Sequence, residues 1–177
     1  MEKKLPLEEM SISDVYVKSQ YVVTYKIPVY QRNYAWEEEQ VTALIKDVYD
    51  SWQKNPLAPY YIGTLVTYKR NDREYEVIDG QQRLTTIYLI IKALGIKDIK
   101  NKLTYSARST STSTIMRLNE DLELGDEADA GIRNGYGYAK KALEAIVLSD
   151  ERDGFQEYFL QHVKLIHYDV PKDVNLN

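Results

Sequence analysis

The sequence contains no cysteine, which excludes a disulfide framework, a thiolate nucleophile and a metal site built on cysteine. No apolar run approaches the roughly 20 residues that a bilayer-spanning helix needs. The charged start MEKKLPLEEM lacks the apolar centre of a signal peptide. We therefore expect a cytoplasmic protein of a bacterium or archaeon, with no membrane as partner.

An excess of basic charge is also lacking, since 23 lysines and arginines stand against 27 aspartates and glutamates. The resulting net charge of −4 is not that of a protein that coats DNA non-specifically. A local basic site remains compatible with it. Phenylalanine occurs twice and tyrosine 16 times, so we expect aromatic packing in which hydroxyls stay near polar groups or water. With 177 residues and 44% hydrophobic composition, the chain is long enough to bury a real core in one domain.

The first half of the sequence predicts strands around one amphipathic helix. Valine and tyrosine in partial alternation predict a strand, or a strand and a loop, over 12–27. A helix is expected from about Glu37 to Trp52, where apolar residues recur at helical spacing after three glutamates. The runs YIGTLVTY and YEVIDG, separated by polar KRNDRE, predict a hairpin.

A second helix, from Gln81 to about Leu94, is apolar on most sides, which is typical of a buried central helix. Gly95 is a natural residue to end it. Beyond it, a strand is expected in KLTYSAR, and the STSTST tract is expected to cap a helix that begins near Ile115. Further helices are predicted at 131–147 and 155–163, before a strand in KLIHYDV.

These patterns predict an α+β fold, a small mixed sheet with the Gln81–Leu94 helix packed against it. We expect one domain over 1–177, made of an α/β core at 11–112, an inserted helical lobe at 113–163 and a strand at 164–177 that returns to the core. The last residues, DVPKDVNLN, have the composition of a loop that leads onward. We therefore expect the chain to be a fragment that continues in a longer protein.

The junction YEVIDGQQR passes from a strand directly into the buried helix. A helix start offers unpaired N–H groups and the positive end of the helix dipole, which favour an anion. Gly80 lets a ligand approach the backbone, and the fork of Arg83 can bind two phosphate oxygens. Gln81 and Gln82 can orient phosphate, ribose or an attacking water, while Asp79 can orient water or hold Mg²⁺.

The same residues also fit a purely structural interpretation. Asp79 would then cap the helix and Arg83 would pair with its carboxylate. Helices that begin in this way are common, and a lone G-x-x-R pattern is weak. The spacing alone does not choose between the two interpretations.

A second constellation, IPVYQRNYAW, places Arg32 among three aromatic residues, Tyr30, Tyr34 and Trp36. Aromatic rings around an arginine can stack a base and hold a phosphate. They can equally pack the first helix onto the sheet. We favour packing for Tyr34 and Trp36, and binding for Gln31 and Arg32, which have no obvious packing role.

The two motifs together resemble the N-terminal domain of GmrSD-type proteins. The resemblance rests on their order and on the helix and hairpin between them, in the segments IPVYQRNYAWEEEQVTALIKDVYDSW, YYIGTLV and YEVIDGQQRLTTIYLII. It covers about 11–94 well and the remainder loosely. It implies a fold similar to the ParB/sulfiredoxin type, in which a G-x-x-R helix start, here Gly80 to Arg83, binds nucleotide phosphates.

By the same resemblance, the motif from Asp79 to Arg83 would bind and hydrolyse a nucleoside triphosphate, with Asp79, Gln82 and Arg83 in catalytic roles and Mg²⁺ as a possible cofactor. Relatives act in restriction of modified phage DNA and pair this domain with a C-terminal H-N-H-type nuclease. His162 and His167 form no such constellation, and His167 has the setting of a buried structural histidine. We therefore expect no nuclease activity in these residues, and DNA contact only through the full-length protein.

Two other classes of protein stay open. One is a non-enzymatic DNA-binding or sensing module of ParB-like type, in which the same arginines contact a DNA backbone. The other is a protein-interaction domain whose junction is only a capped helix. Steep salt dependence without a need for nucleotide would mark the first, and absence of both ligands the second.

Overall fold

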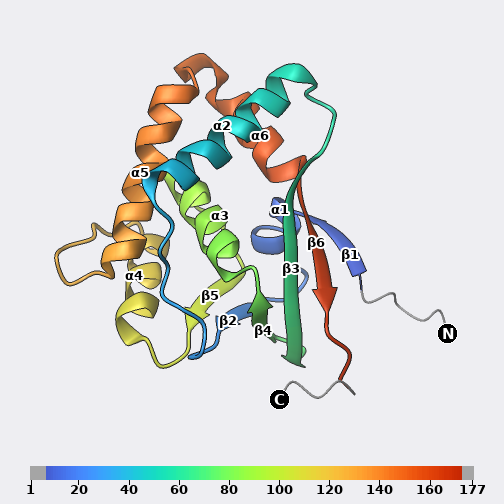
Figure 1. Ribbon diagram of the computed structural model, residues 1–177, viewed down its shortest axis with the longest axis vertical. Coiled ribbons are helices and arrows are strands. Elements are labelled where there is room, and N and C mark those ends of the chain that lie inside the picture. The colour runs from blue at the N-terminus through green and yellow to red at the C-terminus, as the bar shows by residue number, and fades with distance from the viewer. Residues whose placement is uncertain (1–6, 173–177) are drawn as a thin grey trace.

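The computed structural model describes residues 7–172 and shows a mixed α+β architecture with one six-stranded sheet (Figure 1). The predicted α+β class is thereby confirmed. In chain order the elements are β1 Leu7–Ser11, α1 Ile12–Tyr16, β2 Thr24–Ile27, α2 Glu38–Lys54, β3 Tyr60–Asn71, β4 Glu74–Asp79, α3 Gln81–Ala93, β5 Lys102–Tyr105, α4 Ser109–Asn119, α5 Ala130–Ile146, the 3-10 helix η1 Ser149–Glu151, α6 Arg152–Gln161 and β6 Val163–Asp169. None of the helices between residues 7 and 172 has the length and apolarity needed to cross a membrane.

The sheet has the order β1-β6-β3-β4-β2-β5 and mixes both strand directions. β4, β2 and β5 run parallel to one another, whereas β3 is antiparallel to β4. β6 returns to the sheet between β1 and β3, so the predicted last strand is confirmed over its described residues. The helices α4, α5 and α6 therefore lie between two strands of the same sheet in the chain. Residues 173–177 of the predicted onward loop lie outside the described residues.

The prediction of a strand over 12–27 is wrong in its first part, because Ile12–Tyr16 is a helix and only Thr24–Ile27 is a strand. The cause is a capping box at the helix start. The Asp14 amide donates to Ser11 Oγ at 3.0 Å, and the Ser11 amide donates to Asp14 Oδ2 at 2.9 Å. This reciprocal pair satisfies N–H groups that a strand would have paired with a neighbour.

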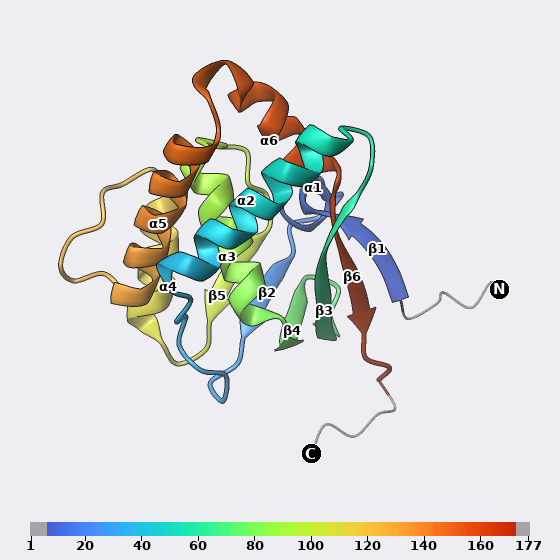
Figure 2. The same ribbon diagram turned by 45° about the horizontal axis from the view of Figure 1, so that its top comes forward.

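α3 is the central helix, as predicted, and nearly every residue after Arg83 is buried. In both views it lies between α5 and the strands β3 and β4 (Figures 1 and 2). The hydroxyl of Tyr16 donates to the Leu84 carbonyl at 2.8 Å, which ties α1 to the start of α3. The helix ends before Gly95, whose φ of +81° lies in the left-handed region that glycine adopts readily.

The STSTST tract was predicted to precede a helix that begins near Ile115, and this prediction is wrong. The tract forms the first half of α4, which begins at Ser109. The hydroxyls have partners that make this possible. Thr112 Oγ1 bonds both the amide and the carbonyl of Tyr105 in β5, at 3.0 and 3.1 Å. Ser111 Oγ donates to Asp129 at 2.7 Å. These bonds direct two hydroxyls away from the α4 backbone, whereas Thr114 Oγ1 donates to the Thr110 carbonyl within the helix at 2.7 Å.

Candidate functional site

The junction between β4 and α3 is built on Gly80, which has φ +98° and ψ +11°. A Cβ at this position would come within 2.9 Å of the Thr64 carbonyl oxygen in β3, so both the conformation and the space favour glycine. No side chain caps α3, and its first turn contains no acidic residue. The first N–H groups of α3 and its positive end therefore carry no neutralising side chain.

The structural alternative for this junction is wrong. Gly80, not Asp79, occupies the N-cap position. Asp79 is exposed at the end of β4, and within residues 7–172 its side chain forms neither a hydrogen bond nor an ion pair. Arg83 is exposed as well and forms no ion pair in that part of the chain. The carboxylate and the guanidinium are thus both available to a ligand.

Arg83 lies against the backbone of Gly63 in β3 and shares its surroundings with two residues that the sequence did not indicate. Burial raises the pKa of Tyr60, the charge of Asp47 in α2 raises it further, and the charge of Arg83 lowers it. Asp47 and Arg83 therefore both lie close enough to Tyr60 for their charges to act on it. This brings α2 and the start of β3 to the edge of the site.

The loop that carries the IPVYQRNYAW motif runs alongside the junction. Gln31 Nε2 donates to the Ile78 carbonyl at 2.8 Å, one residue before Asp79. Gln82 binds the same loop further on, since its Oε1 accepts from the Ala35 amide at 2.9 Å and its Nε2 donates to the Asn33 carbonyl at 3.0 Å. The exposed Arg32 lies on the segment between these anchors. The two predicted motifs are thus neighbours in space.

Gln82 has both ends of its amide engaged with backbone and is only 8% exposed. Its geometry is that of a residue that holds the loop in place. Gln81 is half-buried, and within the described part of the chain its side chain makes no comparable bond. Of the two glutamines, Gln81 is therefore the one whose amide is available to a ligand.

Of the three aromatic residues in the loop, two pack against the core and one is exposed, in agreement with the packing interpretation of Tyr34 and Trp36. Tyr34 is 3% exposed and shares a 2.8 Å hydrogen bond with Thr86 Oγ1 in α3. Burial raises its pKa to about 12, although the bond with Thr86 acts in the opposite direction. Trp36 packs against the core. Tyr30 is 65% exposed, and its hydroxyl donates to Glu76 Oε1 at 3.2 Å.

Arg108, between β5 and α4, is a third arginine beside this loop. Its Nη2 donates to the carbonyls of Gln31 and Val29. Its Nη1 is buried and has no hydrogen-bond partner within residues 7–172. The sequence contained a signal for this residue, because Arg108 ends the segment KLTYSAR in which a strand is predicted, and the carboxyl ends of parallel strands meet at one edge of a sheet.

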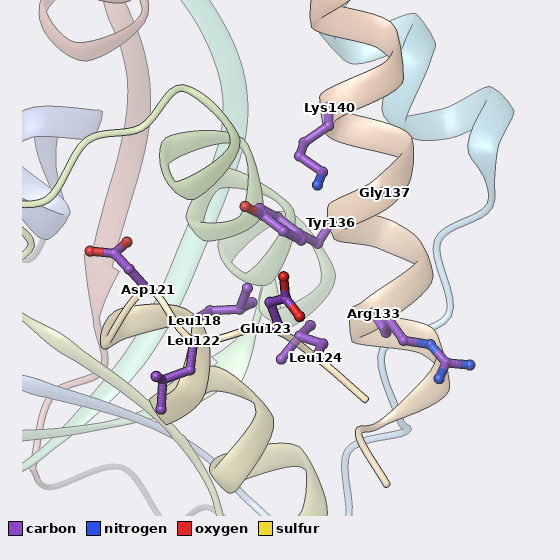
Figure 3. A pocket seen from close by; sticks show the side chains of 9 residues that line it. All are labelled: Leu118, Asp121, Leu122, Glu123, Leu124, Arg133, Tyr136, Gly137 and Lys140. Carbon is purple, nitrogen blue, oxygen red and sulfur yellow. The ribbon is translucent and has the colours of Figure 1, made fainter. Parts of the chain in front are cut away.

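A separate hollow of about 490 Å³ lies between α5 and the loop after α4 (Figure 3). Lys140 extends toward the Tyr136 ring, with its Nζ 4.8 Å from the ring centroid, whereas Arg133 points away and donates to the Gly125 carbonyl. None of the predicted site residues lines this hollow. The junction and the hollow are therefore distinct features.

The protein is thus a mixed α+β domain in which the start of α3 has no side-chain cap and carries the exposed Arg83. A family described as the GmrSD restriction endonuclease, N-terminal domain, matches residues 12–176. The chain belongs to this family and is therefore a module of a restriction or defence protein. No curated protein matched the chain.

Proposed function

We propose that this domain binds a nucleoside triphosphate at the start of α3 and hydrolyses it, within a DNA restriction protein. The observation that carries the proposal is the uncapped helix start, which has an exposed Arg83 and no acidic residue in its first turn. A helix N-terminus and a guanidinium together attract phosphate oxygens. The proposal includes the ParB/sulfiredoxin-like interpretation of the fold, which places the phosphate at the same G-x-x-R turn.

In the proposed complex, the N–H groups of Gln81 and Gln82 and the fork of Arg83 bind phosphate oxygens. Arg32 approaches from the neighbouring loop, where Gln31 and Gln82 hold the backbone. Two guanidinium groups would then neutralise charge that develops on the transferred phosphoryl group. The exposed ring of Tyr30 is the aromatic surface of this loop on which a base can stack.

Hydrolysis assigns a role to Asp79. Its free carboxylate orients a water molecule and takes its proton as the water oxygen attacks the γ-phosphorus, while the bond from that phosphorus to the bridging oxygen breaks. Residues 7–172 contain no cluster of three or more side chains suited to hold a metal. A single carboxylate still fits Mg²⁺, because this ion is commonly bound by one or two carboxylates together with substrate phosphates.

A titration of the 177-residue chain with labelled ATP, GTP and CTP, with and without Mg²⁺, tests the proposal. Arg83→Ala removes a charge-assisted bond, so we expect affinity to fall by about 10- to 150-fold, since such bonds contribute roughly 1.5–3 kcal/mol. Arg73→Ala is the matched control, because Arg73 is an exposed arginine at the hairpin turn. Binding and turnover by Arg83→Ala at the parental level would show that the assignment is wrong.

Asp79→Asn separates binding from hydrolysis in the same assay. The amide keeps the size of the side chain but cannot take a proton, so we expect turnover to fall by about 10²-fold or more while affinity changes little. Equal turnover by parent and variant would remove Asp79 from the proposed mechanism.

The rival function is DNA binding by the same exposed arginines, without catalysis. Both are free of ion pairs within the described residues, as contact with a DNA backbone also requires. The distinction lies in salt, because the affinity of a protein for DNA falls steeply as the salt concentration rises. Binding of duplex DNA in the absence of nucleotide, with such a salt slope and with loss in Arg83→Ala, would favour the rival.

A further inference from the structure

Gly63 lies in the interior of β3, where glycine is unusual and marks a bulge or a close approach. Its φ is +140°, and the pairing of β3 with β6 shifts register between Tyr61 and Gly63. The bulge accounts for the backbone conformation. It does not explain why the Arg83 side chain lies over this glycine.

Three atoms of the Arg83 side chain occupy the space above Gly63. A Cβ built at Gly63 would lie 2.5 Å from Nη1, 2.8 Å from Cζ and 3.1 Å from Nε of Arg83. The guanidinium therefore rests directly on the backbone of β3. Any side chain at Gly63 would displace it, since real Cβ atoms do not come so close to other heavy atoms.

The next residue of β3 touches the junction as well. The carbonyl of Thr64 faces Gly80 so closely that a Cβ there would lie 2.9 Å away. One dipeptide of β3, Gly63–Thr64, thus contacts both the first and the last residue of the G-x-x-R turn, through backbone and without a side chain of its own. The approach of Thr64 to Gly80 continues the antiparallel pairing of β3 with β4, in which Val66 lies opposite Asp79. The contact of Gly63 with Arg83 is made by a side chain outside this pairing, and strand pairing alone does not require it.

We propose that Gly63 is a positioning residue of the phosphate site, and that its bare backbone fixes the direction of the Arg83 fork. This inference rests on the proposed function, since it assumes that Arg83 binds phosphate. A planar guanidinium held against a flat backbone loses less freedom when it binds two oxygens than one that moves in solvent. Gly63 acts through Arg83 and makes no contact with the ligand itself.

A double-mutant cycle tests this role, with inorganic tripolyphosphate as the probe. If Gly63 acts through Arg83, Gly63→Ala weakens binding about tenfold in the parent and has no effect in the Arg83→Ala background. The control is Gly95→Ala, because Gly95 also has a left-handed φ, +81°, but no atom within 4 Å of the added Cβ. This control introduces a side chain at a positive φ without displacing any neighbouring atom, and we expect parental affinity.

An equal loss of affinity in both backgrounds would show that Gly63 matters only for the backbone and would overturn the inference. Parental affinity in Gly63→Ala would overturn it too. A failure of the proposed function gives a different pattern, in which Arg83→Ala alone leaves tripolyphosphate binding unchanged.

A measurement on the parent protein needs no folded variant. ¹⁵N relaxation of Arg83 Nε should report an order parameter near that of the rigid backbone, about 0.8 or higher, whereas the exposed Arg73 should fall below about 0.6. Equal mobility of the two side chains would contradict the proposed role of Gly63.

Discussion

At the scale of single residues, the most informative side chain is Gln82. Its sequence position, next to Arg83, suggested a direct role toward a ligand. The structure shows an amide whose two ends bind the loop backbone at Ala35 and Asn33. The same residue type in the same motif can thus serve by holding a neighbouring loop, which a linear pattern does not reveal.

Gln82→Ala should lower the free energy of unfolding by about 1–3 kcal/mol, because two net hydrogen bonds of roughly 0.5–1.5 kcal/mol each are lost and loop backbone groups lose their partners. Gln81→Ala is the control at the adjacent position and should change stability by less than about 0.5 kcal/mol. Urea unfolding of the three proteins measures both differences. Similar stabilities for the two variants would contradict the holding role of Gln82.

The two candidate motifs were predictable from the sequence because each combines residue types with a physical reason to bind phosphate. Their proximity was not predictable, since Gln31 reaches Ile78 and Gln82 reaches Asn33 across 47 and 49 positions in the chain. Gly63 lies in YYIGTLV, one of the segments on which the family resemblance rests. A glycine in a strand signals a close approach, but the sequence does not say which side chain approaches.

At the scale of elements, α5 supports the loop that bears Arg32. A Cβ at Gly131 would overlap the carbonyl oxygen of Tyr34, and one at Gly135 would lie 2.6 Å from the Tyr34 ring. These two glycines, one helical turn apart, leave room for Tyr34 between α5 and α3. The helical segment after β5 therefore shapes the site without contributing a ligand-binding residue to it.

Gly131→Ala should destabilise the protein by about 1–3 kcal/mol, because the backbone carbonyl of Tyr34 cannot move aside as a flexible side chain would. Gly137→Ala in the same helix meets no atom within 4 Å and should stabilise the protein by about 0.5–1 kcal/mol, the usual gain of alanine over glycine in a helix. Thermal unfolding distinguishes the two. Effects of the same sign would argue against the close contact of α5 with the loop.

At the end of α3, one ion pair makes the free energy of unfolding depend on pH. The buried Lys92 donates to Asp121 Oδ1 at 3.0 Å, and this bond and the charge of Lys92 lower the pKa of Asp121. A folded-state pKa below the unfolded value stabilises the protein at neutral pH, and this contribution is lost as the pH falls through the folded pKa. Asp121→Asn should thus be less stable than the parent at pH 7.

The gap between parent and Asp121→Asn should shrink on acidification below about pH 4, the ordinary range of an aspartate pKa, because the parental carboxylate then becomes neutral too. Urea unfolding of both proteins at a series of pH values measures this gap. A gap that stays constant with pH would show that Asp121 and Lys92 do not interact as charges.

Most elements followed from local patterns, and the exceptions have local physical causes. Apolar residues at helical spacing predicted α2, and a segment that is apolar on most sides predicted α3. Two strand-like runs around a polar turn predicted β3 and β4, and alternation predicted β6. The short α1 was not predicted, because valine and tyrosine are typical of strands. The spacing of Ser11 and Asp14, which form its capping box, was nevertheless a sequence signal for a helix start. α4 was misplaced because its hydroxyls bind Tyr105 and Asp129, partners that only the fold brings near.

At the scale of the whole molecule, membership in the GmrSD N-terminal family and the exposed junction support the same proposal. The net charge of −4 gives the protein as a whole no excess of positive charge, so any phosphate binding must come from a local group of basic residues. Arg32, Arg83 and Arg108 lie on or beside two neighbouring segments. We expect a compact anion to bind where these arginines adjoin the start of α3.

Amide chemical shifts of the ¹⁵N-labelled chain during a titration with ATP test the central claim most directly. We expect the amides of Gln81, Gln82 and Arg83 and the Nε–H of Arg83 to shift together along one saturable curve. In Arg83→Ala the backbone amides of 81–83 should reach saturation only at ATP concentrations about 10- to 150-fold higher. Saturable shifts confined to the hollow beside Tyr136 and Lys140, with the start of α3 unchanged, would contradict it.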